Sequence, residues 1–110
     1  MLSHRKQRVA GLVRRQLSEL LKKEVHDPRL SLISVTDAFV SSDLRQAKVF
    51  YTLLLPEDHN LQEIQEVLNK ATGYLRHLLA RSTILRYAPD LVFYYDNSIE
   101  KADRIRRLLN

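Results

Sequence analysis

The sequence predicts one α+β domain in which helices cover one face of a three-stranded sheet, in the order α-β-β-α-α-β with a short last helix. Two periodicities predict this class. Apolar residues recur every three or four positions over residues 4–25 and 60–87, as in helices, and alternate with other residues over 32–40 and 44–55, as in strands. The chain has 110 residues, 45% of them hydrophobic, which is material for a single modest core. We therefore treat residues 1–110 as one domain.

Residues 4–25 are predicted to form the first helix. Ser3 is suited to cap its start, and Pro28 ends it because proline disfavours helical geometry in the residue before it. The apolar face consists of Val9, Leu12, Val13, Leu17, Leu20 and Leu21. A second, basic stripe on the opposite side consists of Arg8, Gly11, Arg15, Ser18 and Lys22.

The first two strands are predicted over residues 32–40 and 44–55, joined as a hairpin by the turn-forming sequence Ser41-Ser42-Asp43. Asp37 interrupts the apolar side of the first strand, which indicates either an edge strand or a bulge. The second strand has apolar residues on both sides, so we expect it at the centre of the sheet.

Residues 60–71 and 74–87 continue a single helical apolar stripe, with Gly73 between them. Asn60 and Glu63 have the spacing of a capping box at the start of this segment. A glycine inside a helix costs about 1 kcal/mol relative to alanine. The segment is therefore either one helix with a weak point or two helices that meet at a kink.

A third strand is predicted over residues 91–95, which are β-branched, aromatic or leucine. The long helical segment before it suits a crossover between parallel neighbours, which makes the sheet mixed, with strand order 1-2-3. Asn97 and Glu100 indicate the start of a short last helix that runs to about Leu109.

The charge distribution favours a polyanionic partner. The formal net charge is +5 with an isoelectric point near 9.7, and the positive charge is concentrated in residues 1–29 and 61–89, while 30–60 is acidic. Solvated helix faces would explain the same pattern without any partner, so both interpretations stay open.

Several function classes are excluded on composition. The absence of cysteine excludes disulfides and thiol catalysis. No apolar run is long enough to span a bilayer, and the polar, basic start is no secretory signal, so we expect a cytoplasmic protein with no membrane partner. The histidines show no metal-ligand spacing, and no nucleophile–base pattern or glycine-rich phosphate loop is present. We expect no metal, no cofactor and no enzymatic activity.

Four fragments of the chain together resemble the ribosome-binding factor A family, which has a type II KH-like fold. They are Asp27-Pro28-Arg29-Leu30, Asp43-Leu44 with Ala47-Lys48-Val49-Phe50, Ala71-Thr72-Gly73-Tyr74, and Phe93-Tyr94-Tyr95-Asp96-Asn97-Ser98. Most KH domains hold nucleic acid with a GxxG loop; members of this family carry Ala-x-Gly there, as this chain does.

The resemblance implies a non-catalytic ribosome biogenesis factor. Such a protein binds 16S rRNA within free small (30S) subunits or their precursors and assists late maturation, including processing of the 5′ region of the RNA. It further implies a monomer, a link to growth in the cold, and action alongside other assembly factors such as a releasing GTPase. The alternative that we keep is a protein-interaction module that reaches the ribosome through another factor, by way of the acidic segment 30–60.

The predicted RNA-binding residues lie on the first helix and around and beyond Gly73. They are Arg5, Lys6, Arg8, Arg15 and Lys22, followed by Ala71, Thr72, Gly73, Tyr74, Arg76, His77, Arg81 and Arg86. Cations among them would contact the RNA backbone, which dominates affinity; the other interpretation is that they only solvate helices.

Glycine and the tyrosines carry further alternatives. Gly73 has no side chain, so it either lets a phosphate approach the backbone at the start of a second half-helix or only allows the helical segment to bend. Tyr74 is the best candidate for stacking on a base. Tyr51, Tyr94 and Tyr95 alternate within strands, which favours packing in the core or on the sheet over stacking.

Overall fold

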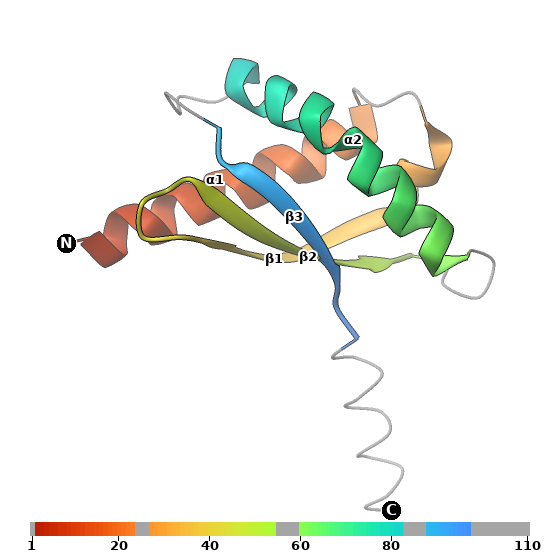
Figure 1. The fold of residues 1–110 in the computed structure, drawn as a ribbon, viewed down its shortest axis with the longest axis horizontal. Coiled ribbons are helices and arrows are strands. Elements are labelled where there is room, and N and C mark those ends of the chain that lie inside the picture. Colours follow the sequence, from red (N-terminus) through yellow and green to blue (C-terminus); the bar gives the residue numbers. More distant parts are fainter. Residues whose placement is uncertain (1, 24–26, 55–59, 83–87, 98–110) are drawn as a thin grey trace, which may run out of the picture.

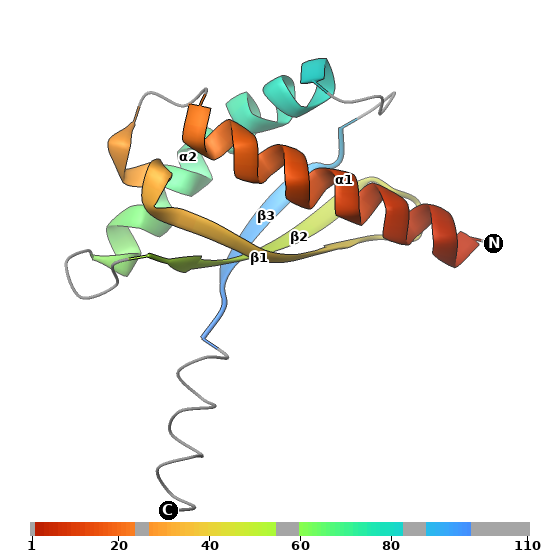
Figure 2. The same ribbon diagram turned by 180° about the vertical axis from the view of Figure 1, so that it is seen from behind.

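Two long helices lie on the same side of a three-stranded sheet (Figures 1 and 2). The computed structural model describes residues 2–23, 27–54, 60–82 and 88–97. In chain order, the elements are helix α1 (Leu2–Lys23), the 3-10 turn η1 (Pro28–Leu32), strands β1 (Ile33–Val40) and β2 (Gln46–Leu53), helix α2 (Leu61–Ser82) and strand β3 (Asp90–Tyr95). The predicted α+β class and three-stranded sheet are confirmed. Residues 98–109 of the predicted last helix lie outside the described residues.

The sheet has the predicted order β1-β2-β3, with β1 antiparallel and β3 parallel to β2. Between Val35 and Asp37 the register of β1 against β2 shifts, which marks a β-bulge at Thr36. Both interpretations of Asp37 are therefore confirmed, because β1 is an edge strand and also carries a bulge. The Thr36 hydroxyl donates to Asp96 Oδ2 at 2.9 Å, which joins β1 to the end of β3.

The turn between β1 and β2 is held by Asp43. Its Oδ1 accepts hydrogen bonds from the Ser41 hydroxyl at 2.7 Å and from the Arg45 N–H at 3.1 Å. These bonds stabilise the ionised carboxylate and lower the pKa of Asp43. Leu44 takes the left-handed conformation, with φ of 62°, while its side chain packs against the core.

Helix α2 runs without interruption from Leu61 to Ser82, so the two-helix interpretation of this segment is wrong. Leu68 and Leu75, on either side of Gly73, are both fully buried. Burying two leucines contributes about 3 kcal/mol or more, which exceeds the cost of about 1 kcal/mol for a glycine inside a helix. Residues 83–87 of the predicted second half-helix lie outside the described residues.

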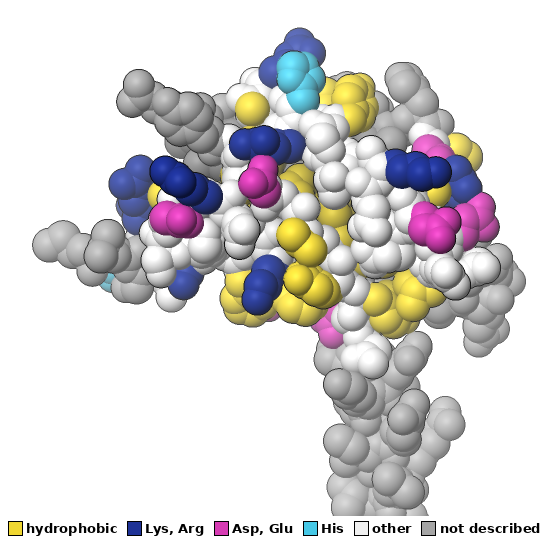
Figure 3. All heavy atoms as spheres, viewed as in Figure 1, with side chains coloured by type: hydrophobic (Ala, Val, Ile, Leu, Met, Phe, Trp, Pro, Cys, Tyr) yellow, Lys and Arg dark blue, Asp and Glu magenta, His cyan; other side chains and the backbone are white. Residues whose placement is uncertain are grey.

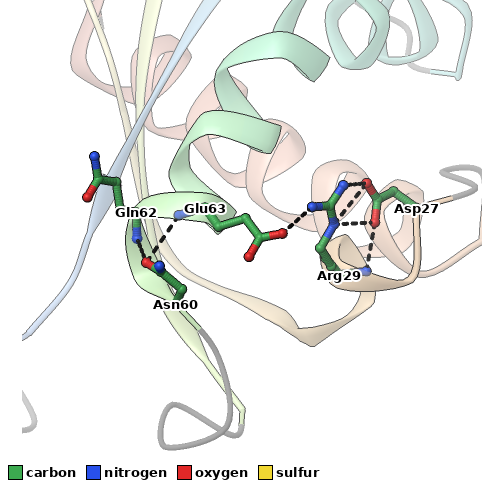
Figure 4. A network of polar contacts seen from close by, with 5 residues as sticks. All are labelled: Asp27, Arg29, Asn60, Gln62 and Glu63. Atoms are coloured by element: carbon green, nitrogen blue, oxygen red, sulfur yellow. Dashed lines mark hydrogen bonds and ion pairs between the residues drawn. The ribbon is translucent and has the colours of Figure 1, made fainter.

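Asn60 caps α2 as predicted, whereas Glu63 does not complete the capping box (Figure 4). The Asn60 side-chain oxygen accepts from the N–H groups of Gln62 at 2.9 Å and Glu63 at 3.4 Å. The Glu63 carboxylate instead binds the Arg29 guanidinium. Helix α1 begins at Leu2 and therefore includes Ser3, so Ser3 lies in the first turn and not at the predicted cap position.

The core lies between the helix layer and the sheet, and Tyr51 of β2 is at its centre. Tyr51 is fully buried and its hydroxyl donates to Gln65 of α2, whose side-chain N–H donates in turn to the Phe93 carbonyl at 3.0 Å. Burial, with a smaller contribution from Tyr95, raises the pKa of Tyr51 to about 12. Largest among the other fully buried side chains are Leu17, Leu21, Leu30, Ile64, Leu68, Leu75 and Leu79.

Candidate nucleic-acid interface

Helix α1 presents its positive charge on two different sides. Arg8, Arg15 and Lys22 are exposed and seven residues apart, on the side opposite the buried Val13 and Leu17, so the predicted basic stripe is formed. We call these three residues the α1 stripe. Within the described chain, none of them takes part in an ion pair.

Lys6 and Arg14 belong to the other side of α1. Both line an open cavity of about 520 Å³ between this helix and the edge strand β1. The structure thus separates Lys6 from Arg8 and Arg15, with which it was grouped from the sequence. Arg5 is exposed on α1 but does not line this cavity.

Helix α2 carries a second row of exposed side chains. Lys70, Tyr74, His77 and Arg81 follow one another at spacings of four, three and four residues, which places them on one side of the helix. We call these four residues the α2 stripe. Figure 3 shows Lys or Arg and His side chains together over the C-terminal half of α2. No cation of this stripe has an ion-pair partner in the part of the chain that the structure describes.

Lys70 was missed as a candidate from the sequence. It lies on the N-terminal side of Gly73, whereas the cations predicted for this segment all lie beyond the expected kink. Its spacing of seven residues from His77 is the signal that would have found it, because residues seven apart share a helix face.

Arg76 does not belong to this row. Its Nε donates to the Ala88 carbonyl at 3.1 Å, and its Nη1 forms an ion pair with Asp90 Oδ1 at 3.1 Å. These contacts join α2 to the start of β3. Arg76 was predicted as an RNA contact, but its guanidinium is engaged within the fold. Arg86 lies outside the described residues.

The Ala71-Thr72-Gly73 segment forms no helix start. Because α2 continues through it, there is no set of unpaired N–H groups or positive dipole end at Gly73, and that part of the prediction is wrong. Ala71 is half-buried against the core, and the Thr72 hydroxyl donates to the Asn69 carbonyl at 2.9 Å. Gly73 itself is exposed, and a Cβ built there would meet nothing within 4 Å.

Arg29 joins η1 to α2 and is also engaged (Figure 4). Its Nε and Nη2 donate to the Asp27 carboxylate, with 2.7 Å from Nη2 to Oδ2, while its Nη1 donates to Glu63. These bonds raise the pKa of Arg29 and lower that of Asp27, because each stabilises the charged form of its partner. Arg29 therefore serves the fold and adds no unpaired charge to the surface.

The described residues contain no group of three His, Cys, Asp or Glu side chains that is placed to hold a metal ion. Among the same residues, no helix is both long and apolar enough to cross a membrane. What the described surface offers is unpaired positive charge along two helices.

Sequence comparison connects this arrangement to one protein family. The model of the ribosome-binding factor A family matches residues 5–109. Ribosome-binding factor A of Coxiella burnetii (strain Dugway 5J108-111) is 62% identical over 108 residues, which cover 98% of this chain and 89% of that protein. The Halothermothrix orenii protein of the same name is 42% identical, over 99% of this chain and 88% of the relative.

Solved structures agree with the sequence matches. The crystal structure of ribosome-binding factor A from Thermus thermophilus superposes with a TM-score of 0.70 and 26% identity, covering 82% of this chain and 94% of that one. A homology model of the T. thermophilus factor, fitted into the cryo-EM map of a 30S complex, superposes with a TM-score of 0.66 and 25% identity, over 80% of this chain and 91% of the other.

Proposed function

The chain belongs to the ribosome-binding factor A family, and from that premise we propose that it binds 16S rRNA of the immature small (30S) subunit and assists late maturation of that subunit. The proposal includes processing of the RNA 5′ region and a role that is not catalytic. The T. thermophilus factor fitted into a 30S complex supports the choice of partner.

The proposal rests on two rows of basic residues, one on α1 and one on α2, that form no ion pairs among the described residues. The α1 stripe and the α2 stripe both lie on helix sides turned away from the buried core residues. Helix α1 has Glu19 as its only acidic residue within Leu2–Lys23. Cations that are not paired with carboxylates can neutralise phosphates and release their counterions, which is the main source of affinity for RNA.

Arg76 and Arg29 are excluded from the proposed interface. Each is bound by protein groups, so an RNA phosphate would have to replace a contact that the fold already makes. We therefore place the RNA contacts at Arg8, Arg15 and Lys22 of the α1 stripe, and at Lys70, His77 and Arg81 of the α2 stripe, with Tyr74 beside them.

The test measures binding of the full chain to immature small subunits and to naked 16S rRNA over a range of salt concentrations. The double substitutions Arg8→Gln with Arg15→Gln, and Lys70→Gln with Arg81→Gln, each remove two charges. We expect each pair to lower the slope of log affinity against log salt by about 1.4 to 1.8, since each phosphate contact contributes about 0.7 to 0.9. Arg45→Gln removes one charge at the exposed β1–β2 turn, outside both stripes, and is the single-charge control.

Two results would count against the proposal. Binding to naked 16S rRNA that is unchanged in both double variants would show that the stripes do not contact RNA. Binding to subunits that is insensitive to salt, together with no binding to naked RNA, would favour the protein-interaction alternative. In that case, crosslinks should fall on ribosomal protein or on another assembly factor.

A further inference from the structure

The sheet face that the helices leave uncovered carries a row of aromatic side chains. Phe39 of β1 contacts Phe50 of β2 edge to face, with ring centroids 5.8 Å apart, and Phe50 stacks on Tyr94 of β3 at 5.6 Å. Phe39 is 55% exposed and Tyr94 is 43% exposed, although both are large hydrophobic residues. The rings lie on three adjacent strands, so they form one row across the sheet, which we call the aromatic row.

Lys48 adds a positive charge beside this row. In the strand register it lies between Phe39 and Val92, and it is two residues from Phe50 on the same face of β2. Lys48 is exposed and has no ion-pair partner among the residues that the structure describes. In Figure 3, hydrophobic side chains surround a Lys or Arg side chain where Figure 1 places the sheet.

The carboxylates of the surrounding strands are already engaged. Asp37 Oδ1 accepts the Ala38 N–H at 2.8 Å, and Asp90 pairs with Arg76. Asp96 accepts the Thr36 hydroxyl. The donors to Asp37 and Asp96 are uncharged, so these two carboxylates keep their negative charge, whereas Asp90 is paired with a cation.

The aromatic row continues into a second basic feature at the sheet edge. Phe39 lines the cavity of about 520 Å³ between α1 and β1, together with the cations Lys6 and Arg14 and the carboxylate of Asp37. A chain that lies on the aromatic row can therefore pass around the edge strand toward two further cations. Gly11 borders the same cavity and leaves open space there, since a Cβ built on it would meet nothing within 4 Å.

We infer that this open sheet face binds unpaired nucleotides of RNA, with bases stacked on Phe39 and Tyr94 and phosphates held by Lys48, Lys6 and Arg14. Every base has a π-face that can stack on an aromatic ring, and a strand of bases brings the anionic backbone that these cations need. The inference deepens the proposed function, and it rests on that function for the presence of RNA. It assigns unpaired RNA to the sheet and leaves the structured RNA backbone to the α1 and α2 stripes.

Charge argues against a second copy of the chain on this face. A two-fold contact through the aromatic row would bury the Lys48 side chain of each copy among apolar side chains, and burying a charge without a partner is costly. A neutral apolar protein surface would leave the same cation without a partner. The phosphate backbone of a stacked strand provides the opposite charge.

The test uses the full chain and two labelled probes: an unstructured oligoribonucleotide of about eight nucleotides and a blunt-ended RNA duplex without unpaired nucleotides. The variants are Phe39→Ala, Tyr94→Ala and Lys48→Gln. Leu54→Ala removes a side chain that is 59% exposed at the end of β2, and it serves as the apolar control. Circular dichroism checks that every variant is folded.

We expect Phe39→Ala and Tyr94→Ala each to weaken binding of the oligoribonucleotide by about 10-fold, because stacking on one ring contributes this much per base. Lys48→Gln should lower the salt slope by about 0.7. Leu54→Ala should bind like the parent, and all four variants should bind the RNA duplex unchanged. Crosslinks from 4-thiouridine in the oligoribonucleotide should map to peptides of β1 and β3.

Unchanged binding of the oligoribonucleotide by folded Phe39→Ala and Tyr94→Ala variants would overturn the inference. So would a variant that binds both RNA probes like the parent but loses binding to small subunits, because that face would then dock a protein. The double variant Lys70→Gln with Arg81→Gln separates this failure from failure of the proposed function. If it loses binding to subunits while the sheet variants keep it, only the inference about the sheet is wrong.

Discussion

Replacing Arg76 with alanine tests whether this side chain holds the fold together. The substitution removes the hydrogen bond from Nε to the Ala88 carbonyl, at 3.1 Å, and the ion pair with Asp90, at 3.1 Å. A hydrogen bond from a charged donor contributes about 1.5 to 3 kcal/mol. The ion pair adds only a few tenths of a kcal/mol because both side chains are more than half exposed. We therefore expect the free energy of unfolding to fall by about 2 kcal/mol.

Urea unfolding measures this loss. The chain has five tyrosines and no tryptophan, so tyrosine fluorescence and far-ultraviolet circular dichroism are the suitable signals. With a denaturant slope of roughly 2 kcal/mol per molar for a domain of this size, the midpoint should fall by about 1 M. Asp90→Asn removes the ion pair alone and should cost less than about 1 kcal/mol. His77→Ala, next to Arg76 but on the exposed side, should change stability by no more than about 0.5 kcal/mol.

The opposite pattern would refute the assignment of Arg76 to the fold. If Arg76→Ala unfolds at the same urea concentration as His77→Ala, its contacts with Ala88 and Asp90 contribute nothing. If it also binds 16S rRNA as weakly as the double variant Lys70→Gln with Arg81→Gln, then Arg76 contacts RNA as first predicted from the sequence.

Two further predictions concern Gly73 and Asp27. Gly73→Ala should raise the free energy of unfolding by up to about 1 kcal/mol, since α2 is continuous and the added methyl group meets nothing within 4 Å, and it should leave binding to small subunits unchanged. Weaker binding by this variant, in the same salt series, would show that RNA approaches the bare backbone there. Hydrogen bonds from Arg29 lower the pKa of Asp27 from its ordinary value of 3.8. The stability that the ionised carboxylate contributes is therefore complete above pH 3.8 and is lost as the pH falls through the lowered pKa. The melting temperature of the parent should therefore exceed that of Asp27→Asn at pH 6, and the difference should shrink below pH 4; a constant difference would contradict the assignment.

Local sequence patterns determined most of the secondary structure. The four- and three-residue spacing of Val13, Leu17 and Leu20 defines the buried face of α1, because a helix repeats every 3.6 residues. Asp37 indicated either an edge position or a bulge for β1, and the structure has both, since a charge on the apolar side is tolerated only where the strand is exposed or irregular. The four fragments that resemble the family likewise needed no tertiary information.

The continuity of α2 and the partners of its side chains were decided only by the tertiary structure. Gly73 predicted a weak point, but burial of Leu68 and Leu75 against the same core outweighs the cost of the glycine. Helical spacing placed Arg76 off the core face, but it could not show Asp90 opposite, because that contact depends on where β3 begins. In the same way, Phe39, Phe50 and Tyr94 are far apart in the chain and form one row only through the register of three strands. A periodic pattern reports which side of an element is buried, whereas the partner of an exposed side chain depends on how the elements are placed against one another.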